Sequence, residues 1–219
     1  MPVKKTAPVV PGLKLERALH RAGIQRIAGL DEAGRGAWAG PVVAAAVVLP
    51  LDRHDLKRTL KGVRDSKLVP EPERERLAER IRSVAVSIGI GASSAREVDQ
   101  SGLLPATRTA MRRALLGLGL PAEYLLLDYL LLPELHVHQT ALPHGDAHVL
   151  SIAAASIIAK VSRDELMRHI NGYFPGYGFD HNKGYGTPLH RRALHRLGPC
   201  PVHRQTYEPV AQLEMSDLL

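Results

Sequence analysis

The segment from residue 27 to residue 49 limits the possible folds more than any other part of the 219-residue chain. Two apolar runs in it are separated by a short corner that is charged and rich in glycine. Short apolar runs that end at turn-forming residues are typical of buried β-strands. The segment therefore predicts two strands, at about 25–31 and 41–49, joined by a polar connection.

The corner itself carries the first candidate for chemistry. Adjacent carboxylates, Asp31 and Glu32, end the first run, and the triplet Gly34-Arg35-Gly36 follows at once. Glycines leave the backbone open to close approach, and paired acids attract cations. The corner therefore suits a site where a polyanion meets metal ions. A polar hairpin tip is the alternative, since Asp and Gly are common in turns for conformational reasons alone.

The rest of the chain alternates between helical and strand periodicity. Two connections interrupt this pattern, a polar one at 50–70 and a loop rich in glycine and aromatic residues at 171–187. Strands separated by helices are typical of α/β layering. Helices are predicted at 13–22, 70–82, 107–116, 149–170 and 188–197, and further strands at 84–91, 124–128 and 137–142, with Ser94 as the cap of a short helix.

The composition is that of a globular protein whose partner is negatively charged. Hydrophobic residues make up 45% and charged residues 23% of the chain, enough for one large domain. Lys and Arg number 29 against 22 Asp and Glu, a net charge of +7, which favours polyanions as partners. Aromatic residues are only 4%, which argues against a platform that stacks single-stranded bases.

Targeting signals and disulfides are not evident in the sequence. Cys200 is the single cysteine, so no internal disulfide can form. The N-terminal residues have no apolar core of signal-peptide length, and the most apolar region, 114–135, is interrupted by Pro121 and Asp128. We expect a cytoplasmic protein, and a monomer.

Four carboxylates share a context that suggests a metal site. Asp31, Glu32 and Asp128 end apolar strands, and Asp146 lies in a loop directly before a buried helix. Acids that converge at one edge of a sheet repel each other unless divalent cations neutralise them, and oxygen ligands suit Mg²⁺ or Mn²⁺. For Asp146, a capping role at the N-terminus of the helix remains an equal alternative.

Several motifs, in order, resemble the ribonuclease HII family. The first is Asp31-Glu32-Ala33-Gly34-Arg35-Gly36 with the apolar run after it, and the second is Asp65-Ser66-Lys67-Leu68. Two more lie at 151–164 and 177–187, and the likeness covers about residues 14–210. The resemblance implies a ribonuclease H-like fold, a mixed five-stranded sheet flanked by helices with a helical C-terminal extension.

The same resemblance implies an activity. The family cuts the RNA strand of RNA–DNA hybrids and nicks duplex DNA 5′ of embedded ribonucleotides, leaving 3′-hydroxyl and 5′-phosphate ends. By resemblance, Asp31, Glu32, Asp128 and Asp146 are the catalytic carboxylates of a two-metal site for Mn²⁺ or Mg²⁺.

Substrate contacts are implied at two loops. Gly34, Arg35 and Gly36 would meet the ribose 2′-hydroxyl, the group that separates RNA from DNA, and Tyr185 would pack on the adjoining sugar. Candidate phosphate contacts are the cations Lys67, Arg163 and Lys183.

This chain departs from the family pattern at a few positions. Ala37-Trp38 follows the glycine-arginine-glycine triplet where Gly-Pro-Leu is usual, and Leu68 replaces a second lysine. His144 replaces a lysine two residues before Asp146, which puts a titratable charge there. The carboxylate set is intact.

Two other readings stay open. A nuclease of the same fold could act on another nucleic-acid structure, such as branched DNA, and a basic binding module could carry these acids for structural reasons only. We expect Asp164 to form an ion pair on a helix surface, and the histidines at 181, 190 and 195 not to bind zinc.

Three parts are predicted: a flexible basic tail at 1–12, the catalytic domain at 13–187, and a helical extension at 188–219 packed on it.

Overall fold

A computed structural model describes residues 10–216 of the chain. Its centre is a five-stranded sheet with the strand order β3-β2-β1-β4-β5. The strands are β1 (Ile27–Ala33), β2 (Val42–Val48), β3 (Ser87–Ser93), β4 (Tyr124–Asp128) and β5 (His138–Leu142). β2 is antiparallel to β1 and β3, whereas β4 is parallel to β1 and β5, so the predicted mixed five-stranded sheet is confirmed.

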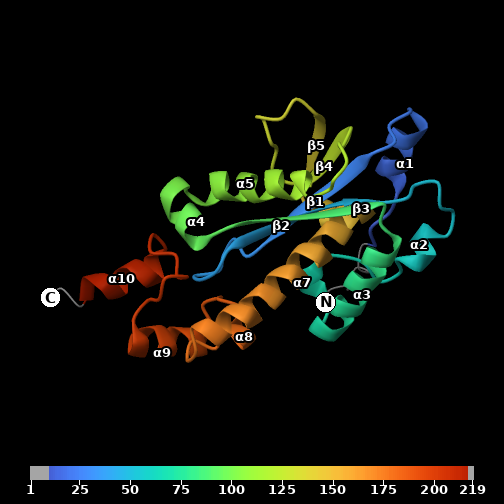
Figure 1. Cartoon of the computed structure of the whole chain (residues 1–219). Helices are drawn as coiled ribbons and strands as arrows, with labels where there is room; N and C mark the ends of the chain where they lie inside the picture. Colours follow the sequence, from blue (N-terminus) through green and yellow to red (C-terminus); the bar gives the residue numbers. More distant parts are fainter. Residues whose placement is uncertain (1–9, 217–219) are drawn as a thin grey trace, which may run out of the picture.

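Helices cover both faces of the sheet (Figure 1). On one face α5 (Leu103–Leu116) lies along β3 and β2, and on the other α7 (Leu150–Tyr173) crosses β1 and β2 beside α3 (Glu71–Val84). The shorter helices are α1 (Lys14–Arg21), α2 (Leu56–Thr59), α4 (Ala95–Ser101), α6 (Gly145–His148), α8 (Phe179–Asn182), α9 (Pro188–Leu197) and α10 (Glu208–Ser216), with a 3₁₀ turn at Ser66–Leu68.

Each face of the sheet has its own apolar core. Small and branched side chains of β2 alternate between the faces, so Ala45 and Val47 pack toward α7 while Ala44 and Ala46 pack toward α5. At Gly29, in the middle of β1, a Cβ atom would collide with the backbone of α7. This close approach requires glycine and lays the start of α7 directly on the strand that carries the acidic pair.

Sequence patterning located most elements and misplaced several boundaries. β4 begins and ends at the predicted residues, and Ser94 forms a capping box with Glu97 at the start of α4. The prediction of a strand from residue 84 was wrong, because α3 continues to Val84 and β3 begins at Ser87. The connections expected at 50–70 and 171–187 contain α2, the 3₁₀ turn, the end of α7 and α8.

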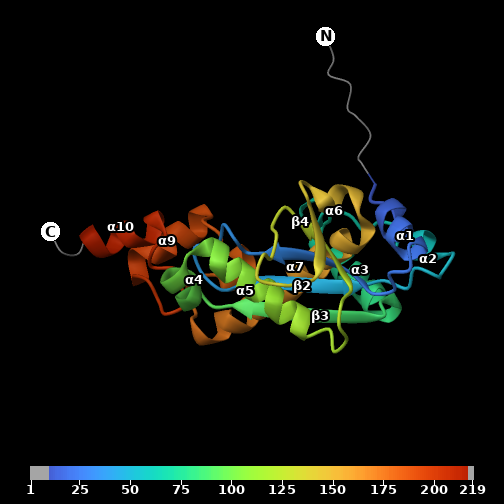
Figure 2. The same ribbon diagram turned by 90° about the horizontal axis from the view of Figure 1, so that it is seen from above.

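The two ends of the molecule are formed by different parts of the chain. α1 and α2 lie at one end and α9 and α10 at the other (Figure 2). The tail predicted at 1–12 falls mostly on residues 1–9, which lie outside the described residues. Within 10–216, no helix combines the length and apolarity that a membrane crossing requires.

Candidate active site

Three carboxylates meet at one edge of the sheet. Parallel pairing of β1 with β4 brings Asp31 and Asp128 to the same edge, and the return from β5 delivers Asp146 in the short helix α6. One carboxylate oxygen from each of these residues lies within 4.8 Å of the other two. Such a cluster can hold a divalent cation, because carboxylate oxygens are its preferred protein ligands.

The electrostatics of the cluster favour a cation. Asp31 is buried, and burial together with the charges of Glu32 and Asp128 raises its pKa well above the usual value. Burial and the neighbouring acids Asp65 and Asp128 raise the pKa of Asp146 to about 6. Carboxyl groups that resist ionisation for these reasons are stabilised as carboxylates when a metal ion joins them.

Glu32 lies beside this cluster, and within the described part of the chain only one of its two carboxylate oxygens is hydrogen-bonded. Its Oε1 atom accepts a hydrogen bond of 3.1 Å from Nη1 of Arg35, whereas its buried Oε2 atom has no hydrogen-bond partner among the described residues. Burial raises the pKa of Glu32, partly offset by Arg35. A buried carboxylate oxygen without a donor is a further observation that fits a cation here.

The alternative role of Asp146 as a helix cap is not supported. The N-cap residue of α7 is Val149, and no side chain caps that helix end. Asp146 lies instead in the first turn of α6. Asp128 is the acid that fixes this turn, because its Oδ1 atom accepts a hydrogen bond of 2.7 Å from the backbone N–H of Gly145.

Lys67 is the cation that faces the cluster. Asp65 accepts a hydrogen bond of 2.9 Å from the backbone N–H of Lys67 and so holds the 3₁₀ turn. Burial would lower the pKa of Lys67, but the charges of Asp65 and the three clustered acids outweigh it and raise the pKa. The ammonium group is therefore charged, and Lys67 lines the same cavity as Asp31, Glu32 and Asp128.

The loop of Gly34, Arg35 and Gly36 is held by arginines from distant segments. Gly34 has a φ of 93°, a conformation that favours glycine, and a Cβ atom there would collide with Arg163. The guanidinium of Arg204 donates to the carbonyl oxygens of Gly34 and Arg35 at 2.6 and 2.7 Å. The backbone of this loop is thus fixed before any substrate arrives.

A cavity of about 620 Å³ joins Asp31, Glu32 and Asp128, but not Asp146, to this loop and to Tyr185. The Tyr185 ring centroid lies 5.2 Å from Cζ of Arg163 and 5.5 Å from Nζ of Lys160. The ring is therefore backed by two cations. Predicted site residues in the wall of the cavity are Asp31, Glu32, Gly34, Arg35, Gly36, Lys67, Asp128 and Tyr185.

Two predicted phosphate contacts lie behind the cavity instead of in its wall. Arg163 is fully buried and donates to the carbonyl oxygens of Pro41, Lys183 and Ala39 at 2.9, 2.9 and 3.1 Å. Lys183 is also buried, and its Nζ atom bonds the carbonyl oxygen of Asp180. Both side chains bond the protein and so help to hold the loops, and their role as phosphate contacts stays a prediction.

Other sequence expectations are also corrected or refined. Asp164 does pair with Lys160, at 2.6 Å, but the pair is not on the surface, because Asp164 is buried and also lies 3.9 Å from Arg74. The described residues contain one cluster with the geometry of a metal site, the three acids, and no histidine is part of it.

The roles of Arg204, Trp38 and Ser156 were not predicted from the sequence. Ser156, in the second turn of α7, lies beside Asp31 and favours its charged form, and its hydroxyl donates to Oγ of Ser66 at 3.0 Å. Trp38 packs beneath Gly186, where a Cβ atom would collide with the indole, and Arg191 lies 5.4 Å from its ring. The backbone N–H of Trp38 donates to the carbonyl oxygen of Gly184 at 2.8 Å, so this residue ties the two substrate loops together. In the sequence, the only sign of this role of Trp38 is its position between the glycine triplet and β2.

Comparisons with known proteins agree with this geometry. The profile of the family Ribonuclease HII matches residues 28–210. A protein named Ribonuclease HII from Synechococcus sp. (strain JA-3-3Ab) is 52% identical over 210 residues, covering 96% of this chain and 94% of that protein. Ribonuclease H2 from Pyrococcus horikoshii OT3 superposes with a TM-score of 0.74 at 24% identity, covering 87% of this chain and 98% of that one. Bst-RNase HIII, solved in complex with Mn²⁺, gives a TM-score of 0.69 at 20% identity, over 91% and 72% of the two chains.

Proposed function

The chain belongs to the ribonuclease HII family, and on that premise we propose that its acidic edge nicks duplex DNA 5′ of an embedded ribonucleotide and cuts the RNA strand of RNA–DNA hybrids. As a member of this family it is a hydrolytic endoribonuclease that depends on divalent metal and acts on nucleic acid. The residue roles below are our assignment.

The observation that carries the assignment is the cluster of Asp31, Asp128 and Asp146, whose oxygens lie within 4.8 Å of one another. With the unpaired oxygen of Glu32 beside it, this donor set fits two Mg²⁺ or Mn²⁺ ions. When bound, such ions would activate a water and stabilise the leaving 3′-oxygen, which would give 3′-hydroxyl and 5′-phosphate ends. Bst-RNase HIII, which shares the fold, was solved with Mn²⁺.

The chain's own residues would place the scissile phosphate. The four acids would hold the cations, and Lys67, which lines the same cavity, would offer an ammonium group to the phosphate. Arg35 is half-exposed and bonded to Glu32, so its guanidinium can bridge the acidic site and a phosphate.

Selection of ribose would come from the two substrate loops. The fixed backbone at Gly34, Arg35 and Gly36 offers peptide groups to a 2′-hydroxyl, and no side chain at the glycines blocks the approach. Tyr185 would lie flat on the neighbouring deoxyribose and leave no room for a second hydroxyl. We assign residues 188–219 to the same domain, because Arg204 bonds the glycine triplet.

The test compares three duplexes that differ only at one 2′ position. They carry a hydroxyl, a hydrogen or a methoxy group there, and each is incubated with Mg²⁺, with Mn²⁺ or with EDTA. We expect a single nick 5′ of the ribonucleotide, only with the hydroxyl and only with metal.

Matched variants separate substrate selection from general nuclease activity. Tyr185→Ala should lose cleavage at a single ribonucleotide by about tenfold or more, while Glu165→Gln, an exposed acid elsewhere on α7, should match the wild type. Equal cleavage of the hydroxyl and hydrogen duplexes would refute the proposed reading of the 2′-hydroxyl.

A further inference from the structure

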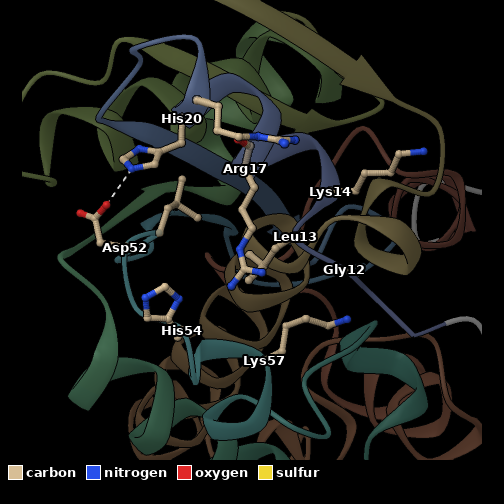
Figure 3. Close-up of a pocket in the computed structure, with 10 residues that line it drawn as sticks. Gly12, Leu13, Lys14, Arg17, His20, Asp52, His54 and Lys57 are labelled. Atoms are coloured by element: carbon tan, nitrogen blue, oxygen red, sulfur yellow. Dashed lines mark hydrogen bonds and ion pairs between the residues drawn. The ribbon is translucent and has the colours of Figure 1, made fainter.

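A second cavity, of about 840 Å³, lies at the other end of β1 from the acidic cluster. Its walls are α1, which precedes β1, and the connection from β2 to α2 (Figure 3). β2 runs antiparallel to β1, so its continuation at Leu51 lies beyond the beginning of β1, whereas Asp31 lies near the end of β1. The cavity is therefore separate from the site described above.

The walls of this cavity carry a concentration of positive charge. Lys14, Arg17 and Arg21 recur at helical spacing and form one stripe of α1, which faces the cavity. Lys57 comes from α2 on the opposite wall, with His54 beside it. Figure 3 shows the Arg17 side chain extending from α1 across the space toward the side that bears Lys57 and His54.

Among residues 10–216, these charges have no acidic side chain paired with them. Asp52 is the single carboxylate in the cavity wall, and it bonds His20 at 2.8 Å. Within the part of the chain that the structure describes, none of Lys14, Arg17 and Lys57 forms an ion pair, whereas Arg53 nearby pairs with Asp55. Four full positive charges around one cavity repel each other, and an anion placed among them removes that repulsion.

Acids on the neighbouring elements do not offset this charge. Glu16, on the opposite side of α1, is buried and accepts hydrogen bonds from the backbone and the hydroxyl of Ser151. Asp55 is occupied by Arg53 and Thr59. The cavity is thus open, cationic on two facing walls, and equipped with a guanidinium fork and ammonium groups, which are the side chains that bind phosphate oxygens.

We propose that this cavity is a second phosphate-binding site, in which Arg17 and Lys57 hold the phosphate from opposite walls. Asp31 pairs with Ala45, and Leu51 lies six residues further along β2 and its continuation. At about 3.3 Å per residue this is roughly 20 Å, or about six base pairs of a duplex. A backbone phosphate of the duplex bound at the acids can supply the ligand, which rests on the proposed function; a free polyphosphate is the other source.

The variant that tests this site is Arg17→Ala/Lys57→Ala. Arg58→Ala/Lys61→Ala is its control, because it removes the same charge from exposed neighbours that do not line the cavity. Thermal unfolding curves check that the wild type and both variants are folded. Binding is measured in EDTA, so neither metal nor cleavage contributes to the result.

Two ligands distinguish the sources. The first is a labelled duplex that extends about ten base pairs on each side of a single ribonucleotide, titrated at several salt concentrations. The second is tripolyphosphate, titrated by calorimetry. With a backbone phosphate in the cavity, the salt slope of duplex binding falls by about 1 and affinity falls about five- to tenfold in Arg17→Ala/Lys57→Ala, but not in the control.

Each outcome decides the question. Loss of tripolyphosphate binding in the test variant alone, with unchanged duplex binding, supports the phosphate site and assigns it to a free polyphosphate. If the test variant and the control bind both ligands alike, the second site does not exist. These binding measurements do not depend on cleavage. Failure of the proposed catalytic function would therefore appear in the nicking assay and would not change them.

Discussion

The carboxyl group of Asp146 destabilises the metal-free folded protein when it is charged. Its carboxyl group is buried near Asp65 and Asp128, and these surroundings raise its pKa from 3.8 to about 6. Above that pH the folded protein holds a charge that the unfolded chain would accommodate more easily. Without metal, the acidic cluster is therefore a source of instability.

We expect Asp146→Asn to stabilise the metal-free protein in a pH-dependent way. Since the folded pKa lies above the unfolded value, the contribution of the acid is favourable below about pH 4 and is lost as the pH rises through about 6. The two-unit shift, discounted for solvent screening, gives the variant an advantage of about 1–2 kcal/mol near pH 7 and almost none near pH 4. Urea unfolding in EDTA at both pH values measures it.

Metal provides the control for this prediction. Added Mn²⁺ should stabilise the wild type more than Asp146→Asn and so reverse the order of the two proteins. An advantage of the same size at both pH values would contradict the account, because it would show that the charge of Asp146 is not what destabilises the fold.

At the scale of secondary structure, the acids are brought together by the pairing of β1 with β4 and by the close contact between α7 and β1. The sequence predicted β4 and located β1 because three or more apolar residues precede each acid, but β1 continues to Ala33 instead of ending at Asp31. It could not predict that α7 touches β1 at Gly29, because a single glycine in a strand has several explanations. The boundary of β3 was missed because an apolar stretch that ends a helix resembles the start of a strand.

Gly29→Ala should therefore damage both stability and activity. The new methyl group would collide with the backbone of Ser151 and Ile152, push α7 away from β1 and separate Ser156 from Asp31. We expect a loss of about 2–3 kcal/mol or more, as for overpacked cores. Gly172→Ala, later in the same helix and facing open space, should be neutral or stabilise by up to about 1 kcal/mol. Equal unfolding free energies for the two variants would exclude the close contact as a constraint.

At the scale of the whole molecule, segments far apart in sequence depend on one buried side chain. Arg204 is fully buried, and its guanidinium donates to the carbonyl oxygens of Gly34, Arg35 and Gly40. Nothing in the sequence distinguished this arginine, since neither spacing nor periodicity connects it with the glycine triplet. The orientation of Arg163 was missed for the same reason, because burial of a cation depends on backbone oxygens that the fold assembles.

Arg204→Ala should uncouple the C-terminal segment from the site. It leaves several buried carbonyl oxygens without donors, which we expect to cost at least about 3 kcal/mol of unfolding free energy. Because the glycine triplet loses its support, cleavage at a single ribonucleotide should fall by about tenfold or more. Arg196→Ala, an exposed arginine of α9, should change stability by no more than about 0.5 kcal/mol. Wild-type stability and cleavage in Arg204→Ala would show that the loop holds its shape without this residue.

The central claim is that the carboxylates at the edge of the sheet hold the metal that cleaves at a ribonucleotide. Its most direct measurement is the nicking rate of Asp31→Asn on duplex DNA with one ribonucleotide in saturating Mn²⁺. Replacing a carboxylate by an amide keeps the shape and removes a metal ligand, so we expect the rate to fall by at least about 10²-fold. Cleavage by Asp31→Asn at the wild-type rate would contradict the account.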